Sequence, residues 1–320
     1  MITLEHVYWL MGVLAAGVAW VNGRDASNPK RWNNAAFWGL YAATFVAGSW
    51  LPHAVTGCLV IAMVAVASIG KLGQTTRESQ TAAQREASAA RWGSWLFLPA
   101  LTIPAVTLLG TFVLKTATVG GAPIVDPKQV TQISLALGAL AGLAVAMVML
   151  RPPAAAPLHE ARRLWDAVGW AAVLPQMLAA LGALFATAGV GKVVSTLAER
   201  WLPLGTPLAA VVTYTVGMAL FTMIMGNAFA AFPVMTAGIG LPLVMTRFGG
   251  DVTVMAAVGM LSGFCGTLMT PMAANFNIVP AALLELKNQY GVIKAQVATA
   301  IPLLIANILI LYFAGYAWSH

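Results

Sequence analysis

Ten apolar stretches follow one another along this chain, and each is close to the length that crosses a lipid bilayer as a helix, about 20 residues. Only 8% of the 320 residues are charged and 60% are hydrophobic, whereas a soluble domain has roughly 25% charged residues. The sequence therefore predicts an all-α polytopic membrane protein with about ten transmembrane helices in the lipid bilayer. The expected spans lie near 4–22, 35–51, 54–70, 94–114, 131–150, 164–188, 206–225, 228–246, 252–270 and 295–317.

The positions of Lys and Arg predict the orientation of these helices, because cytoplasmic loops carry an excess of basic residues. With 23–34 on the cytoplasmic side, 12 of the 17 basic residues fall in cytoplasmic connections. Both termini are then expected outside. The net charge of +7 is explained by these loops and does not indicate a nucleic-acid partner.

The chain is predicted to consist of a first transmembrane half, 1–150, a cytoplasmic connection, 151–163, and a second transmembrane half, 164–320. Thr102-Ile103-Pro104-Ala105 loosely echoes Thr270-Pro271-Met272-Ala273. Broken segments at comparable places are what two inverted repeats of five helices would produce, although the similarity is too low to establish a repeat. Polar connections at 74–91, 158–165 and 189–205 are expected to form surface helices.

Two apolar segments of the second half carry Gly, Pro, Asn and Thr where a simple membrane helix would carry Leu and Val. One surrounds Gly226 and Asn227, and the other runs from Gly263 to Pro280. Backbone groups freed by a break cannot face lipid, and paired breaks of this kind typically mark the binding site of a transporter. We therefore expect both breaks to line a site inside the membrane.

Neutral polar side chains at these breaks are the predicted substrate-binding residues. Half-helix N-termini beside them would direct positive dipole ends inward, which suits a small carboxylate. Unwound backbone could also hold Na⁺ as a coupling ion, at Thr102, Gly226 or Gly266. The alternative is that the Asn and Thr side chains only join neighbouring helices. The predicted substrate contacts are Asn227, Thr236, Thr267, Thr270, Asn275 and Asn277, with Pro271 shaping the turn.

The groups that most enzymes need are missing from the apolar stretches. No phosphate-binding Gly-x-x-x-x-Gly-Lys-Ser/Thr loop occurs, and no Ser, His and Asp set could meet within the membrane. We therefore expect no enzymatic activity, no metal site and no bound cofactor apart from a coupling ion. The four histidines, all near span ends or in loops, are His6, His53, His159 and His320.

Carboxylates are also expected to lie in loops or at span ends. Glu285, which closes the second broken segment, is the only predicted candidate for a proton relay. Its alternative role is an end charge beside Lys287. Cys58 and Cys265 lie inside apolar stretches and are expected to be free, buried thiols.

The segment 226–233, Gly-Asn-Ala-Phe-Ala-Ala-Phe-Pro, and the segment 267–280, Thr-Leu-Met-Thr-Pro-Met-Ala-Ala-Asn-Phe-Asn-Ile-Val-Pro, resemble a bacterial membrane family catalogued as domain of unknown function 979. The length and hydropathy fit along essentially the whole chain. That family is similar to the larger subunit of a two-component 5-oxoproline (pyroglutamate) transporter. More distantly, it is similar to the ion-transporter superfamily, in which paired hairpins hold an anion and move in an elevator-like manner.

The resemblance implies a subunit of an ion-coupled symporter for a small carboxylate in the bacterial inner membrane, together with a smaller companion membrane subunit. Nothing in composition or spacing identifies 5-oxoproline itself. The alternative is a non-transporting scaffold whose partner carries the substrate path. The sequence leaves the coupling ion, Na⁺ or H⁺, open.

Overall fold

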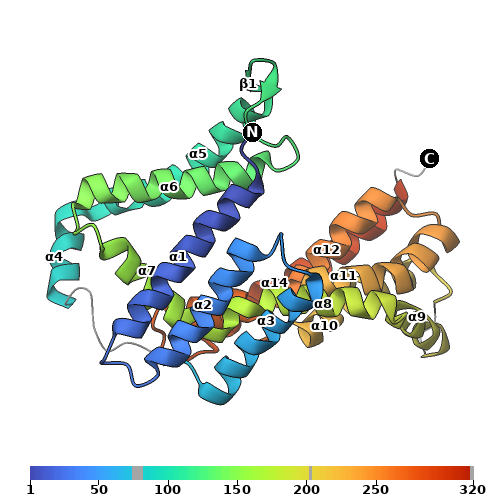
Figure 1. Ribbon diagram of the computed structural model, residues 1–320. Coiled ribbons are helices and arrows are strands. Elements are labelled where there is room, and N and C mark those ends of the chain that lie inside the picture. The colour runs from blue at the N-terminus through green and yellow to red at the C-terminus, as the bar shows by residue number, and fades with distance from the viewer. Residues whose placement is uncertain (74–81, 202–203, 318–320) are drawn as a thin grey trace. The chain divides into compact units, whose positions relative to one another are not determined.

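The computed structural model describes residues 1–73, 82–201 and 204–317, and these residues are almost entirely helical (Figure 1). Among them the only strands are β1 (Thr118–Val119) and β2 (Ala122–Pro123), which form a short antiparallel hairpin. The chain divides into two compact units, Met1–Asp166 and Ala167–His320.

The first unit is built on two antiparallel helix pairs. In one pair, Gly12 of α1 lies against Val46 of α2. In the other, α5 and α6 run side by side (Figure 1), and a Cβ placed on Gly142 would lie 2.8 Å from the carbonyl oxygen of Pro99. Small residues at these contacts let the backbones approach closely, as in other membrane helix pairs. The helices are α1 (Leu4–Arg24), α2 (Arg31–Ala47), α3 (His53–Ala65) continued by a π-helical turn (Val66–Gly70), α4 (Ala82–Trp92), α5 (Phe97–Thr116), α6 (Val130–Leu150) and α7 (Ala156–Val168).

In the second unit, α10 and α12 run parallel to each other. Tyr214 of α10 lies against Gly259 of α12, and Ala219 lies against Gly266. Because both helices run in the same direction, their C-terminal ends lie at the same level. The helices are α8 (Leu174–Thr187), α9 (Val190–Trp201), α10 (Pro207–Met225), α11 (Ala228–Met235) continued by a π-helix (Thr236–Arg247), α12 (Val252–Leu268), α13 (Ala274–Leu283) and α14 (Gly291–Ala317).

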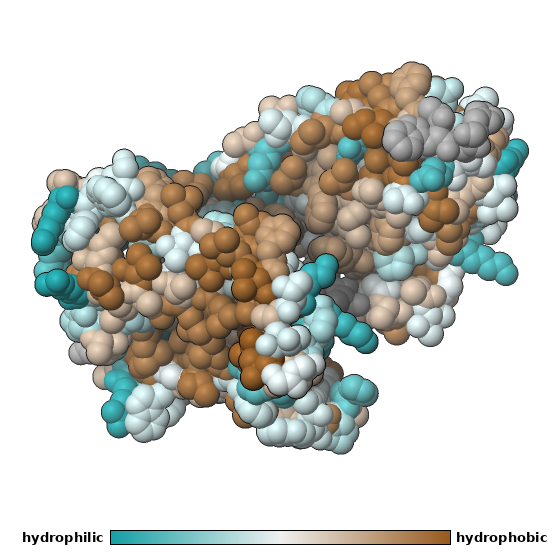
Figure 2. Space-filling model, turned by 90° about the horizontal axis from the view of Figure 1, so that it is seen from above, coloured by the Kyte–Doolittle hydropathy of each residue, from teal (hydrophilic) through white to brown (hydrophobic). Residues whose placement is uncertain are grey.

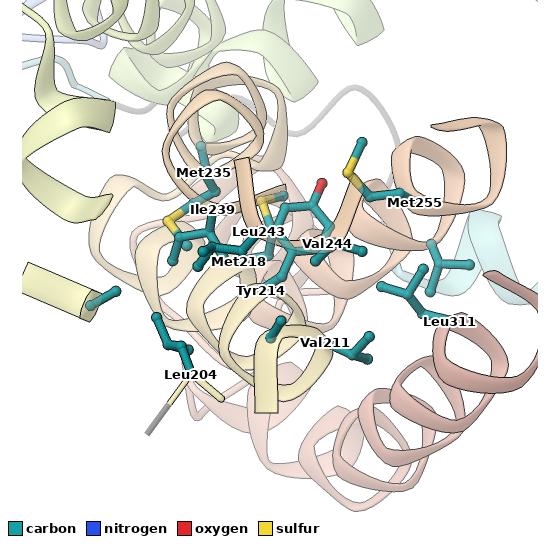
Figure 3. Packing of buried hydrophobic residues seen from close by; sticks show 14 residues of the cluster. Leu204, Val211, Tyr214, Met218, Met235, Ile239, Leu243, Val244, Met255 and Leu311 are labelled. Atoms are coloured by element: carbon teal, nitrogen blue, oxygen red, sulfur yellow. The ribbon is translucent and has the colours of Figure 1, made fainter. Parts of the chain in front are cut away.

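The apolar core of the second unit lies where α10, the π-helix, α12 and α14 meet. Figure 3 shows Tyr214 and Met218 of α10 packed near Ile239 of the π-helix, with Met255 of α12 and Leu311 of α14 completing the cluster. None of these five side chains is more than 2% exposed. Close packing of this kind leaves few voids, so it fixes α10 and α12 relative to each other.

Seven helical segments of the described residues are long and apolar enough to cross a membrane. Figure 2 shows apolar side chains spread over large parts of the surface, and Leu109 and Phe112 of α5 are among those exposed. Such faces suit contact with lipid, so the predicted all-α polytopic membrane fold is confirmed. The seven segments are Leu4–Arg24, His53–Gly70, Ala83–Thr116, Val130–Leu150, Pro207–Met225, Ala228–Arg247 and Gly291–Tyr316.

Among the described residues, fewer segments are long and apolar enough to cross a membrane than the ten spans that the sequence predicts. The predicted span 164–188 is interrupted, because α7 ends at Val168 and a 3₁₀ turn (Gly169–Val173) precedes α8. Gly169 adopts φ +56°, which glycine reaches without the steric cost that other residues incur. An eighth span results only if Ala180–Thr187 and Val190–Trp201, which are bent by 66°, form one crossing.

Two other predicted spans, 35–51 and 252–270, are represented by the 17-residue helices α2 and α12. The predicted surface helix at 158–165 lies within α7. For 74–91 and 189–205, helices occupy Ala82–Trp92 and Val190–Trp201, and residues 74–81 and 202–203 lie outside the described part. Cys58 and Cys265 are both free thiols, but Cys58 is exposed rather than buried.

Replacing Gly266 with alanine should weaken the packing of α10 on α12, because the added Cβ would collide with the backbone carbonyl of Ala219. We expect a lower melting temperature of the purified protein in detergent. Gly57→Ala in α3 is the matched control, since nothing lies within 4 Å of its added Cβ and alanine is favoured over glycine in a helix by about 0.5–1 kcal/mol. Equal melting temperatures for the two variants would contradict the packing role of Gly266.

Candidate functional site

Two helix breaks of the second unit are in direct contact. α10 ends in a tight turn at Gly226, and α12 ends in the turn 269–273. A Cβ placed on Gly226 would lie 2.5 Å from the carbonyl oxygen of Met272, and Gly226 has φ +74°. Glycine is therefore required at this position both by the left-handed backbone and by the neighbouring turn.

Two buried side chains replace backbone hydrogen bonds that the breaks remove. The Thr270 hydroxyl donates to the carbonyl oxygen of Met223 at 2.8 Å and accepts a bond from the Met272 N–H at 3.2 Å. Asn277 Nδ2 donates to the carbonyl oxygens of Thr267 at 2.8 Å and Thr270 at 2.6 Å. The last carbonyl groups of a helix have no partner within that helix, so Thr270 and Asn277 act as caps for α10 and α12. We call Gly226, Asn227, Thr267, Thr270 and Asn277 the break site.

The helices that leave the break site, α11 and α13, start differently. Asn227 Oδ1 accepts the backbone N–H of Phe229 at 2.8 Å and caps α11. α13 starts after Ala273 without any side-chain cap, so its first backbone N–H groups and its positive dipole end are available to an anion. Asn275 lies in this first turn with an exposed side chain. Since α13 already begins at Ala274, Asn275 and Asn277 lie within its first turns and not before the helix.

The break site also contains a hydrogen-bond acceptor that is not used. Asn277 is fully buried, and within the described part of the chain its Oδ1 atom has no hydrogen-bond partner. The same holds for the hydroxyl of Thr222, which lies one turn before Gly226 and faces Gly263 of α12. An amide oxygen can only accept a hydrogen bond or bind a cation. Because both N–H hydrogens of Asn277 are engaged, Oδ1 is the polar atom of this side chain that a ligand could still use. Sequence reasoning did not select Thr222, because only the packing of α10 on α12 buries it.

The structure does not bring all the predicted residues to the break site. Thr236 pairs with the Tyr214 hydroxyl at 3.0 Å, at the level of Gly259. Eight residues separate that level from Thr267, which is about 12 Å along α12. Thr102 lies in the first unit, where its hydroxyl donates to the carbonyl oxygen of Leu98 at 2.8 Å.

Two further predicted residues have positions that the packing explains. Gly266 faces the backbone of Ala219 and serves the contact between α10 and α12. Pro271 is exposed in the turn between α12 and α13. The break site therefore unites Gly226, Asn227, Thr267, Thr270 and Asn277, with Asn275 and Pro271 at its exposed edge.

The sequence predicts Glu285 as the only candidate for a proton relay, but the buried carboxylates lie elsewhere. Glu285 is exposed, whereas Asp25 and Asp166 in the first unit are 2% and 5% exposed. Asp166 does not lie at the start of a membrane span, where the sequence predicts it. α7 continues through this residue and directs its side chain towards Trp38 and Asn22, which bury it. No group of three or more His, Cys, Asp or Glu side chains in the described ranges could hold a metal ion.

The model of a protein family described as "Protein of unknown function (DUF979)" matches residues 5–316. The match includes both helix breaks and nearly all of both compact units. Neither the curated proteins nor the solved structures that were compared give a match. The description of the family assigns no activity, so the function has to be argued from the break site.

Replacing Asn277 with alanine should destabilise the second unit, because two buried carbonyl groups would lose their donor. An unsatisfied buried polar group costs about 1–3 kcal/mol, and we expect a clearly lower melting temperature in detergent. Asn275→Ala on the same helix is the control, since its exposed side chain has no such bonds. If the two variants unfolded at the same temperature, the capping role of Asn277 would be wrong.

Proposed function

Because the chain belongs to the DUF979 family, whose model spans both helix breaks, we propose that it is a subunit of a secondary active transporter for a small carboxylate. The observation that carries this proposal is the contact between two breaks in membrane-type helices, around an uncharged polar cluster. Irregular backbone at membrane depth is tolerated where it lines protein or a wet cavity. Transporters commonly bind substrates at such discontinuous helices.

The charge distribution of the break site favours a monovalent anion. Its members carry no charged side chain, so attraction would come from the uncapped N-terminus of α13, which is equivalent to roughly half a positive charge. A single carboxylate can be held by backbone N–H groups in this way. A divalent anion would need a second positive group, which the break site does not contain.

The unused acceptor of Asn277 suggests which carboxylates fit. A substrate that carries an N–H group close to its carboxylate could bind α13 with the carboxylate and donate to Asn277 Oδ1. The cyclic amide of 5-oxoproline has this combination, which agrees with the resemblance of 226–233 and 267–280 to the 5-oxoproline transporter subunit. Asn277 is fully buried, so the turns at Gly226 and 269–273 would have to separate before a substrate enters.

The proposal also includes the ion coupling, the membrane, the orientation and the partner that the sequence indicates. Transport is ion-coupled symport in a bacterial inner membrane, with both termini outside, and a smaller companion membrane subunit completes the carrier. An elevator-like movement of the two breaks would expose the break site alternately to the two sides. The chain acts without enzymatic activity or a bound cofactor other than the coupling ion.

Binding by the purified chain in detergent tests the substrate site. We expect 5-oxoproline to bind, and cyclopentanecarboxylate, which has the ring and the carboxylate but no lactam, to bind about tenfold more weakly because one hydrogen bond contributes about 1.4 kcal/mol. Titration calorimetry measures both affinities. A scaffold subunit, the alternative function, would bind neither compound.

Uptake into proteoliposomes that contain this chain and its companion tests the role of α13. Asn275→Ala should lower the uptake of labelled 5-oxoproline several-fold without changing the melting temperature, because the exposed amide lies beside the N-terminus that would hold the carboxylate. Gln289→Ala, which removes another exposed amide in the loop after α13, is the control and should transport normally. Unchanged uptake by the Asn275 variant would remove that residue from the site.

A further inference from the structure

The first unit contains a buried polar cluster that the break site does not explain. Asp166 of α7 is 5% exposed, and its Oδ1 atom accepts hydrogen bonds from Trp38 Nε1 at 2.8 Å and Asn22 Nδ2 at 3.2 Å. Asn34 Nδ2 donates to Asn22 Oδ1 at 3.4 Å and to the carbonyl oxygen of Gly73 at 2.7 Å. Asp166 therefore connects α7 to α1, to α2 and, through the two amides, to the segment that follows α3.

The second oxygen of Asp166 is buried without a partner. Across the described ranges, Oδ2 has no hydrogen bond, and the Asp166 carboxylate has no ion pair with a Lys, Arg or His nitrogen within 4.0 Å. Arg162, one turn earlier on α7, instead binds Asp25 at 2.8 Å. Because a buried carboxylate without a paired charge is costly, burial favours the neutral form of this side chain more than water does.

The charged groups around Asp166 do not offset the cost of burying its carboxylate. The charged or titratable groups on the elements around it are Arg162 on its own helix, Asp25 at the end of α1 and Tyr41 on α2, whose ring packs edge-on against Trp165. Burial raises the pKa of Asp166; the bonds from Trp38 and Asn22, the charge of Arg162 and the Asn34 amide lower it only in part. α7 is not one of the membrane-spanning helices, and the first unit ends at Asp166 itself.

We propose that Asp166 is the proton-binding site that couples transport to a proton gradient. In this step a proton from water bonds to Oδ2 and converts the carboxylate into a neutral carboxylic acid, and the return of the proton to water restores the charge. The coupling role rests on the function proposed above, whereas proton binding itself does not. The groups that bind the Asp166 carboxylate directly are the N–H donors of Trp38 and Asn22 rather than oxygen ligands, so a proton fits this position better than a metal cation does.

Binding of a proton at Asp166 changes the contacts of α7 with its neighbours. A change from a charged to a neutral side chain alters the hydrogen bonds that connect α7 to Asn22 and Trp38. The chain passes into the second unit directly after Asp166. Protonation therefore changes how α7 is held within the first unit, directly before the chain enters the second unit.

Infrared difference spectroscopy on the purified chain in lipid tests proton binding without any transport. As the pH is lowered, the wild type should develop the carbonyl band of a protonated carboxylic acid at a higher pH than exposed aspartates do. Asp166→Asn, which places an amide where the neutral acid would lie, should lack this band. Asp126→Asn, which replaces a partly exposed carboxylate that accepts the Lys128 N–H, should retain it. Retention of the band in Asp166→Asn would overturn the proposal.

The pH dependence of stability gives an independent measurement. Because the pKa of Asp166 is raised by folding, the folded chain keeps a proton that the unfolded chain has already released. Its contribution to stability is therefore complete below the ordinary pKa of aspartate and is lost as the pH rises through the higher pKa of the folded state. We expect the melting temperature of the wild type to fall over that interval relative to Asp166→Asn. Parallel melting curves for the two proteins would also overturn proton binding.

Uptake by proteoliposomes containing the chain and its companion tests the coupling. With one proton per substrate, the wild type should accumulate substrate about tenfold for each unit of pH gradient. Asp166→Asn should lose this accumulation but still exchange labelled for unlabelled substrate, and Asp166→Glu should recover part of the accumulation. Gradient-driven accumulation by Asp166→Asn equal to the wild type, or accumulation that follows Na⁺ and not pH, would overturn the coupling role. Absence of both accumulation and exchange in the wild type would instead contradict the proposed transporter and leave the infrared result to decide proton binding.

Discussion

Backbone carbonyl groups at a helix end cannot stay unpaired inside a membrane, and the second unit depends on how this requirement is met. Thr270 donates to the end of α10, and Asn277 donates to the last turn of α12 and to the turn that follows it. These three hydrogen bonds pair carbonyl groups that the two breaks leave free, so that the polar backbone is not exposed to lipid. In the proposed transporter, the bond from Thr270 to Met223 would have to break before a substrate reaches Asn277, because it joins the two breaks.

The breaks meet because of glycine on the neighbouring helix. Gly259, Gly263 and Gly266 face α10, and the close approach that they permit places the two parallel helices in one register. The C-terminal ends of α10 and α12 then lie together, and the turn at Gly226 contacts Met272. A site made of helix ends thus follows from the packing of the helices that precede it.

The two compact units bury polar groups of different kinds. The break site is neutral, and its hydrogen bonds involve amide, hydroxyl and backbone groups. The cluster of the first unit contains Asp25, Arg162 and Asp166, of which the first two form an ion pair. This contrast agrees with a carrier in which one unit binds the substrate and the other responds to a proton.

The sequence by itself determined the membrane class, the positions of most long helices and the turn at Gly226, because hydropathy and glycine conformation are local properties. Spans such as 131–150, 206–225 and 228–246 agree with α6, α10 and the helix that begins with α11 to within a few residues. Local composition could not show that α7 stops at Val168, because hydropathy continues across Gly169.

Only the tertiary structure decided which polar residues meet. It placed Thr236 beside Tyr214 and left Asn277 Oδ1 buried, and it brought Asp166 to Asn22 across 144 positions of the chain. Burial and hydrogen bonding depend on which helix faces which, and residues so far apart in sequence carry no local signal of that contact.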